Sequence, residues 1–115
     1  MSDAARLADI FERIDRIRRA TAGGKEEFFA SEVIQDAVVR SLEVIGEAAK
    51  NITSETRRRH PRVRWKDMAR FRDLAIHHYG KVLIEEVWLI VSKDLPVVRS
   101  SLGGVVAGRS RSARR

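Results

Sequence analysis

The 115-residue sequence contains no cysteine, so it can form neither a disulfide framework nor a zinc site built on thiolates. It also has no long apolar run: the longest, VWLIV at residues 87–91, is far shorter than the roughly 20 residues of a membrane span. The N-terminal segment is amphipathic and mixed in charge, without a signal-peptide core. From these absences we expect a cytoplasmic protein with no membrane association.

Positive charge is concentrated in two short stretches. The net charge is +7, from 23 Lys and Arg against 16 Asp and Glu. Residues 57–72 hold eight Lys or Arg and one acid, while residues 109–115 hold four arginines and no acid. Such focusing suits a polyanion, with nucleic acid as the first candidate. A solvated basic face followed by a disordered tail explains the same charges without any partner.

Apolar residues recur at helical spacing, and no strand-like alternation or internal repeat is visible, which predicts an all-α fold. Ser31 is placed to cap a long helix whose apolar face runs from Ile34 to Ile52. A brief helical turn is expected from Ser54. The main helices are expected over residues up to 22, 32–52, 65–79 and 82–102, with a short turn or helix over 25–30.

One domain is expected over residues 1–102, an antiparallel bundle of four to five helices, followed by a basic, disordered tail over residues 103–115. The helix over 82–102 is apolar on much of its circumference, and Pro96 is expected to kink or restart it. Such a helix is either the centre of a bundle or an oligomer interface. Because only three or four helices are available to cover it, we favour a homodimer.

The stretch RFRDLAIHHYG, residues 70–80, places an arginine among apolar residues. On a helical wheel drawn from Trp65, Arg72 falls near the centre of an apolar face formed by Met68, Ala69, Ala75, Ile76 and Tyr79. Asp73 and His77 share one edge, and Arg72 lies about 140° from His77. An arginine in a sealed core is costly. We therefore expect Arg72 to face a polar, anion-binding cleft that a second copy of the chain completes.

The segment RDLAIHHY, residues 72–79, resembles the R-x4-H-x-Y signature of HepT-type toxins in the HEPN superfamily (higher eukaryotes and prokaryotes nucleotide-binding domains). Three further features resemble the HepT-like group: QDAVVRSLEVIGEAAK at residues 35–50, Trp65 seven residues before the arginine, and EEVWLIVSKDLPVV at residues 85–98. The matching segments cover residues 28–98. Leu83 departs from the pattern, since many relatives have an acidic or polar residue there, and the arginine tail lies outside it.

This resemblance implies an all-α bundle that dimerises, with paired motifs forming a metal-independent endoribonuclease site that needs no cofactor. It implies Arg72 and His77 as catalytic residues, with Asp73, which follows the arginine where the superfamily generally has Asn, Asp or His, in a supporting role. It also implies a toxin opposed by a small nucleotidyltransferase antitoxin of the MNT type. In some members that partner transfers AMP to the motif's tyrosine, which is Tyr79 here.

The chemistry is consistent with RNA as the substrate. RNA supplies its own nucleophile, the 2′-hydroxyl, so the protein need only move protons and stabilise a phosphorane. A histidine such as His77 titrates near neutral pH, and the Arg72 fork can meet the non-bridging phosphate oxygens. Contacts to the RNA backbone are expected from the other basic residues of the central stretch: Arg57, Arg58, Arg59, Arg62, Arg64, Lys66 and Arg70.

Simpler interpretations exist for the same residues. His77 can be a surface histidine near a helix C-terminus, Arg72 can pair with an acid such as Glu47, and Tyr79 can be core packing. His78 is expected to be an exposed neighbour. A metal site is not expected, because adjacent histidines point apart on a helix and no carboxylate stands at a familiar ligand spacing.

Two alternative functions follow from these interpretations. The chain could be a non-catalytic HEPN-type module that binds nucleic acid or a partner protein. It could also serve mainly as a substrate and tether for the nucleotidyltransferase.

Overall fold

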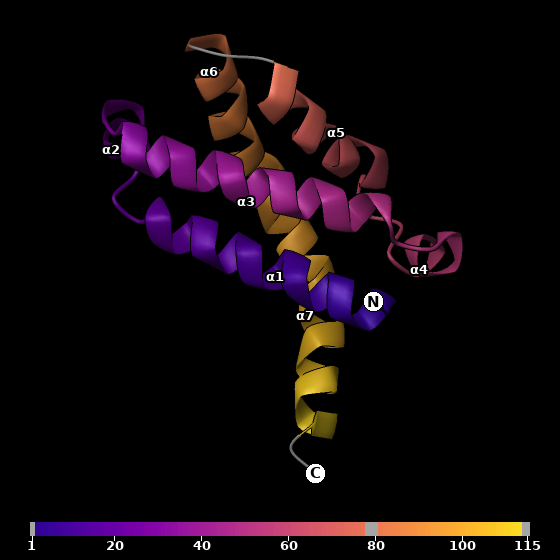
Figure 1. Ribbon diagram of the computed structural model, residues 1–115. Coiled ribbons are helices and arrows are strands. Elements are labelled where there is room, and N and C mark those ends of the chain that lie inside the picture. Colours follow the sequence, from indigo (N-terminus) through magenta and orange to yellow (C-terminus); the bar gives the residue numbers. More distant parts are fainter. Residues whose placement is uncertain (1, 78–80, 114–115) are drawn as a thin grey trace.

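The computed structural model describes residues 2–77 and 81–113, and all regular structure in these residues is helical (Figure 1). The all-α fold expected from the sequence is confirmed. No helix in the described ranges is both long enough and apolar enough to cross a membrane. The elements are α1 (Asp3–Ala20), α2 (Lys25–Ala30), α3 (Glu32–Lys50), α4 (Ser54–Arg59), α5 (Trp65–His77), α6 (Lys81–Leu89), the π-helix η1 (Ile90–Asp94) and α7 (Leu95–Ala113).

Side-chain caps fix where several helices begin. Ser31 Oγ accepts a hydrogen bond from the backbone N–H of Ile34 at 3.2 Å, as the sequence predicted for the start of α3. Ser2 and Thr53 cap α1 and α4 in the same way. Each cap satisfies an amide that has no partner within its own helix. Gly24 has φ 94°, a left-handed backbone that favours glycine, and it turns the chain from α1 into α2.

The helices α1, α3 and α5 lie side by side in one layer, with α3 in the middle and in contact with both neighbours (Figure 1). The helical rod made of α6, η1 and α7 crosses behind this layer and contacts α1 through α7 and α3 through α6. The face of α3 turned away from the rod therefore stays open between α1 and α5.

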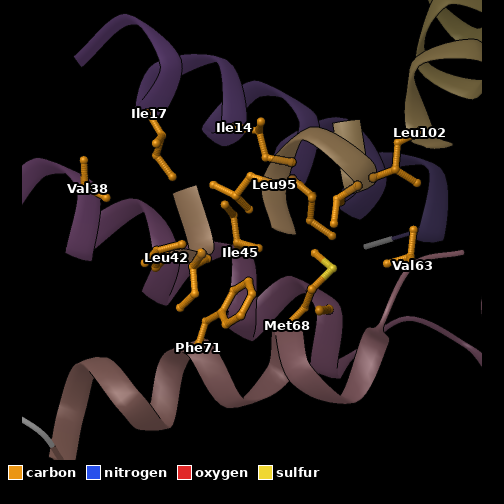
Figure 2. Close-up of a cluster of buried hydrophobic side chains, with 14 of the residues drawn as sticks. Ile14, Ile17, Val38, Leu42, Ile45, Val63, Met68, Phe71, Leu95 and Leu102 are labelled. Atoms are coloured by element: carbon orange, nitrogen blue, oxygen red, sulfur yellow. The ribbon is translucent and has the colours of Figure 1, made fainter. Parts of the chain in front are cut away.

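Apolar side chains from the layer and the rod meet in a single core (Figure 2). Ile14 of α1, Ile45 of α3, Phe71 of α5 and Leu95 of α7 are all buried in it. The apolar face predicted for α3 is confirmed, with Ile34 half-buried at its start and the following positions buried: Val38, Leu42, Ile45, Ala49 and Ile52.

The apolar face of the helical rod is buried against the other helices of the same chain. Its buried positions are Leu83, Val87, Ile90, Leu95, Val98 and Leu102, and Trp88 packs partly buried against the same core. Of the two interpretations offered by the sequence, the rod fits that of a helix covered by its own bundle. Its apolar character therefore does not by itself require a second copy of the chain.

The rod differs from prediction at two places. Pro96 does not interrupt it: η1 widens the helix just before the proline, with the Leu95 N–H bonded to the Ile90 carbonyl five residues earlier. A proline lacks an N–H and clashes with the carbonyl four residues back, and a π turn relieves both problems. The helix also continues to Ala113, where the sequence predicted an end near Leu102 and a disordered tail.

Candidate functional site

The helix α5 presents the motif, and its buried face fixes where each motif position lies. Met68, Phe71 and Ala75 are buried, and the ring N–H of Trp65 donates to the His60 carbonyl at 3.2 Å, which anchors the start of the helix. The apolar face predicted from the sequence does not include Phe71. Including it turns the buried face away from Arg72, which lies at the edge of that face instead of its centre. The prediction that Arg72 occupies the centre is therefore wrong.

The side chain of Arg72 reaches an acid on the neighbouring helix. Its Nε lies 3.3 Å from Glu47 Oε2, and its Nη1 lies 4.0 Å from Asp73 Oδ1. The pairing with Glu47 that the sequence offered as the simpler interpretation is thus present. The Arg72 side chain is 41% exposed, so its charge is hydrated and carries no burial cost.

The Cβ and backbone nitrogen of Arg72, here called its root, pack closely against Gly46. A Cβ at Gly46 would lie 2.8 Å from Arg72 Cβ and 2.9 Å from the Arg72 backbone nitrogen, closer than real Cβ contacts come. Only glycine allows α3 and α5 to approach this closely at this point. The glycine of the IGEA segment therefore determines how Arg72 sits relative to Glu47, the next residue along α3.

Arg72 opens into a cleft of about 660 Å³, here called the Arg72 cleft, on the open face of α3 between α1 and α5. Three arginines and three acids contribute to its lining: Arg6, Arg40, Arg72, Asp9, Glu43 and Glu47. Each arginine has an acid close by, since Arg6 lies 3.6 Å from Asp3 and Arg40 lies 3.2 Å from Glu43. The charges in the cleft are therefore balanced.

Sequence reasoning did not find Arg6 and Arg40 as neighbours of Arg72. Arg40, Glu43 and Glu47 follow one another at spacings of three and four residues, which indicates one stripe on α3. That spacing could have placed Arg40 near the partner of Arg72. The contribution of Arg6 depends on how α1 packs beside α3, and no local pattern shows that.

The remaining motif residues are only partly described. His77 is the last residue of α5, and its position on the helix lies about 140° from that of Arg72. Asp73 is exposed on the outer side of α5, at 65% of its side-chain surface. His78 and Tyr79 lie outside the described residues, so their predicted roles, exposed neighbour and modification site, stay predictions.

The basic residues predicted to contact RNA fall into two groups. Arg58, Arg62 and Lys66 are exposed and form no ion pair within residues 2–77 and 81–113. The others already have acceptors: Arg59 pairs with Glu55, Arg64 and Arg70 flank Asp67, and Arg57 donates to two backbone carbonyls.

Arg57 in particular closes the end of α3. Its Nη2 donates to the Ala49 carbonyl at 2.9 Å and its Nε to the Ile52 carbonyl at 3.2 Å. Ala49 lies in the last turn of α3 and Ile52 lies two residues beyond its end, where a cation is favourable. Arg57 is half-buried, and its guanidinium has a structural task that the sequence did not reveal.

Comparison with known proteins gives a family match over most of the chain. The family described as "Ribonuclease HepT-like" matches residues 10–103. A protein of Thermococcus cleftensis named "Probable ribonuclease HepT" is 42% identical over 94 residues, which cover 81% of this chain and 86% of that protein. No solved structure matches the chain significantly.

Two relatives from Methanocaldococcus jannaschii are similar over comparable lengths. One is named "Putative RNase" and is 37% identical over 101 residues, covering 87% of this chain and 84% of that protein. The other is named "Gamma-glutamylcyclotransferase and putative RNase" and is 38% identical over 97 residues, covering 84% of this chain but only 44% of that longer protein.

Proposed function

Because the chain belongs to the HepT-like ribonuclease family, we propose that it is a metal-independent endoribonuclease and the toxin of a type II toxin–antitoxin pair, acting in the cytoplasm. The observation that supports cleavage best is the state of Arg72. Its Nε lies 3.3 Å from Glu47 Oε2 on α3, and Arg72 lines an open cleft beside the helix that ends at His77.

The proposed reaction is transfer of the phosphate to the neighbouring 2′-oxygen. His77 takes the 2′-hydroxyl proton, the O2′–P bond forms, and the P–O5′ bond breaks. The His77 imidazole then gives this proton to the leaving O5′, so the products are a 2′,3′-cyclic phosphate and a 5′-hydroxyl. Arg72 stabilises the charge that builds on the non-bridging oxygens. Because the substrate supplies the nucleophile, no metal-bound water is required.

A second copy of the chain is proposed to complete this site. Positions 72 and 77 lie about 140° apart on α5, too far for both side chains to converge on one phosphate from a single regular helix. In a homodimer whose α5 helices face each other, an arginine of one copy can meet the histidine of the other.

RNA is proposed to be drawn in by the exposed basic residues that precede the motif. Arg58, Arg62 and Lys66 have charges that no acid in the described ranges neutralises. Each is available for a phosphate, whereas the Arg72 cleft itself is balanced in charge. These residues therefore supply long-range attraction, and Arg72 supplies the contact at the reacting phosphate.

Regulation is proposed to come from a nucleotidyltransferase antitoxin of the MNT type, which transfers AMP to Tyr79. Tyr79 stands two residues after His77 in the sequence. An AMP group there would add an anionic phosphate two residues along the chain from His77, and it would compete with RNA by charge and by bulk.

The test is cleavage of a mixed RNA pool in excess EDTA by wild type, His77→Ala and Arg72→Ala, with analysis of the cut ends and of the mass of Tyr79. We expect wild type free of AMP to produce 2′,3′-cyclic phosphates and both variants to be inactive. A folded, unmodified, dimeric wild type that binds RNA as well as His77→Ala does, without cutting it, would instead support the non-catalytic binding module. AMP on Tyr79 without any intrinsic cleavage would support the tether.

A further inference from the structure

Glu47 stands out in the Arg72 cleft because it is the acid that contacts the guanidinium at its inner nitrogen. Glu47 Oε2 lies 3.3 Å from Arg72 Nε, while Asp73 Oδ1 lies 4.0 Å from Nη1, at the limit of an ion pair. A guanidinium has five N–H donors in a fixed plane, and a phosphate takes two of them in parallel. An acid at Nε leaves the outer pair, Nη1 and Nη2, for a phosphate.

The position of Glu47 is set by the backbone and not by a chance meeting of two long side chains. Gly46 packs against the root of Arg72, with 2.9 Å between its virtual Cβ and the Arg72 nitrogen, and Glu47 is the next residue. The helices α3 and α5 are therefore in contact where the two side chains start. Both carboxylate and guanidinium leave from this contact into the same cleft.

The pair contributes little to holding the fold together. The Arg72 and Glu47 side chains are 41% and 57% exposed, and ion pairs this open to water contribute little to stability. The helices α3 and α5 are joined by buried apolar residues instead, such as Leu42 and Phe71. Glu47 can thus be replaced without loss of the fold, and a change in activity would report on the site.

We propose that Glu47 is a positioning residue for the ribonuclease reaction: it holds Arg72 by Nε so that the two terminal nitrogens meet the scissile phosphate. The role rests on the proposed function of the same site. It differs from simple charge screening, in which Glu47 would only weaken the attraction of Arg72 for RNA. The two roles predict opposite effects when Glu47 is removed.

The first experiment measures kcat and KM on a defined single-stranded RNA for Glu47→Ala, Glu47→Gln and Glu12→Gln. Glu12 is the matched control, because it pairs with Arg16 at 2.7 Å on the outer surface of α1 with similar exposure. Since misplacing a reacting group by about 1 Å can cost roughly 100-fold, we expect Glu47→Ala to lose roughly 10- to 100-fold in kcat with little change in KM. Glu47→Gln keeps an acceptor oxygen and should recover part of that loss.

A double variant separates action through Arg72 from an independent effect. If Glu47 acts through Arg72, adding Glu47→Ala to Arg72→Lys, which keeps a cation but has no Nε, should cause no further loss of cleavage. An unchanged kcat in Glu47→Ala, a lower KM with an unchanged kcat, or a further loss in the double variant would each overturn the positioning role.

An NMR measurement without RNA tests the contact between Glu47 and Arg72 separately from the proposed ribonuclease activity. In a ¹⁵N NMR spectrum, the Arg72 Nε–H resonance, identified by its loss in Arg72→Lys, should shift in Glu47→Gln and stay in place in Glu12→Gln. No shift in Glu47→Gln would overturn the positioning role even if RNA is cleaved. A wild type that does not cleave RNA would overturn the proposed function and the role that rests on it, while the resonance still shows whether Glu47 orders Arg72.

Discussion

Gly46 packs directly against the backbone of Arg72, with no room for a Cβ between them. We expect Gly46→Ala to push α3 away from α5 at this point, because both nearest atoms belong to the root of Arg72 and neither is the end of a flexible side chain. Overpacking of this kind costs roughly 1–3 kcal/mol. The free energy of unfolding in urea should fall by about that amount, and RNA cleavage should fall further than the lost stability explains, because Arg72 moves.

Gly104 provides the control for that substitution. It lies in α7, and a Cβ there would meet nothing within 4 Å. Alanine is the better helix former by roughly 1 kcal/mol, so Gly104→Ala should raise stability slightly and leave cleavage unchanged. Equal effects of the two substitutions would show that the Gly46 contact is not special.

Arg57 and Arg58 are adjacent in sequence but should respond differently to truncation. Arg57→Ala removes two hydrogen bonds to the end of α3 and should lower the free energy of unfolding by roughly 1–3 kcal/mol. Arg58→Ala should leave stability within about 0.5 kcal/mol of wild type. Urea unfolding of both variants checks this, and equal losses would contradict the capping role of Arg57.

RNA binding should show the opposite order. In the His77→Ala background, where RNA is expected to stay intact, Arg58→Ala should weaken binding and reduce the slope of log Kd against log salt by about 1. Lys50→Ala is a suitable control, because it removes one exposed positive charge at the end of α3, outside the basic stretch. A salt slope that does not change in Arg58→Ala would remove Arg58 from the RNA contacts.

Asp3 joins the start of α1 to the connector before α4 and should make stability depend on pH. Its carboxylate accepts hydrogen bonds from Thr53 Oγ1 at 2.5 Å and from Thr56 Oγ1 at 2.7 Å. The hydrogen bond from Thr53, followed by that from Thr56, lowers the pKa of Asp3 below its ordinary value of 3.8. The charged form is thus favoured in the folded state, and its contribution is full above pH 3.8 and lost as the pH falls through the lowered pKa.

Asp3→Asn should therefore be less stable than wild type at pH 7, and the difference should shrink as the pH falls below about 3.8. Thermal unfolding of both proteins between pH 7 and pH 2.5 measures this difference. A gap that stays constant over that range would show that the charge of Asp3 is not what the two threonines stabilise.

Mixing two inactive variants tests whether the site is shared between copies. If the arginine comes from one copy and the histidine from the other, a hybrid of Arg72→Ala and His77→Ala has one intact site out of two. Equal amounts, unfolded and refolded together, should recover about a quarter of wild-type activity, since about half of the dimers are hybrids. No recovery, with exchange of subunits verified by mass, would place both residues of a site on one copy.

The sequence predicted the helices well where the information is local. Ser31 has the right side chain just before a periodic apolar run, and the apolar face of α3 can be identified from spacing alone. The orientation of Arg72 could not be obtained in this way. A helical wheel gives only the angle at which each side chain leaves the helix. Without Phe71, the apolar face predicted for α5 is centred too close to Arg72. The contact with Gly46 that fixes Arg72 depends on which helix packs beside α5.

Contacts between distant segments were out of reach for the same reason. Asp3 and Thr53 are 50 residues apart, and no pattern near either indicates that they meet. In the sequence Arg57 is one of a run of three arginines, yet its neighbour Arg58 is exposed while Arg57 itself donates to a carbonyl of α3. Charge can be read from a sequence, but whether a charge is already neutralised is decided by the packing.

The π-helix before Pro96 contains one more residue than an α-helical turn would need, and the proline is the reason for that extra residue. The buried positions along the rod are three or four residues apart at 83, 87, 90, 95, 98 and 102, except for the step of five from Ile90 to Leu95 that spans η1. The extra residue in that turn keeps both halves of the rod in phase with the core. A relative lacking the proline could lose one residue here and keep every core contact, whereas deletion with the proline retained would force the clash that η1 avoids. Replacement of Pro96 and deletion of one residue from η1 are therefore expected to occur together among relatives.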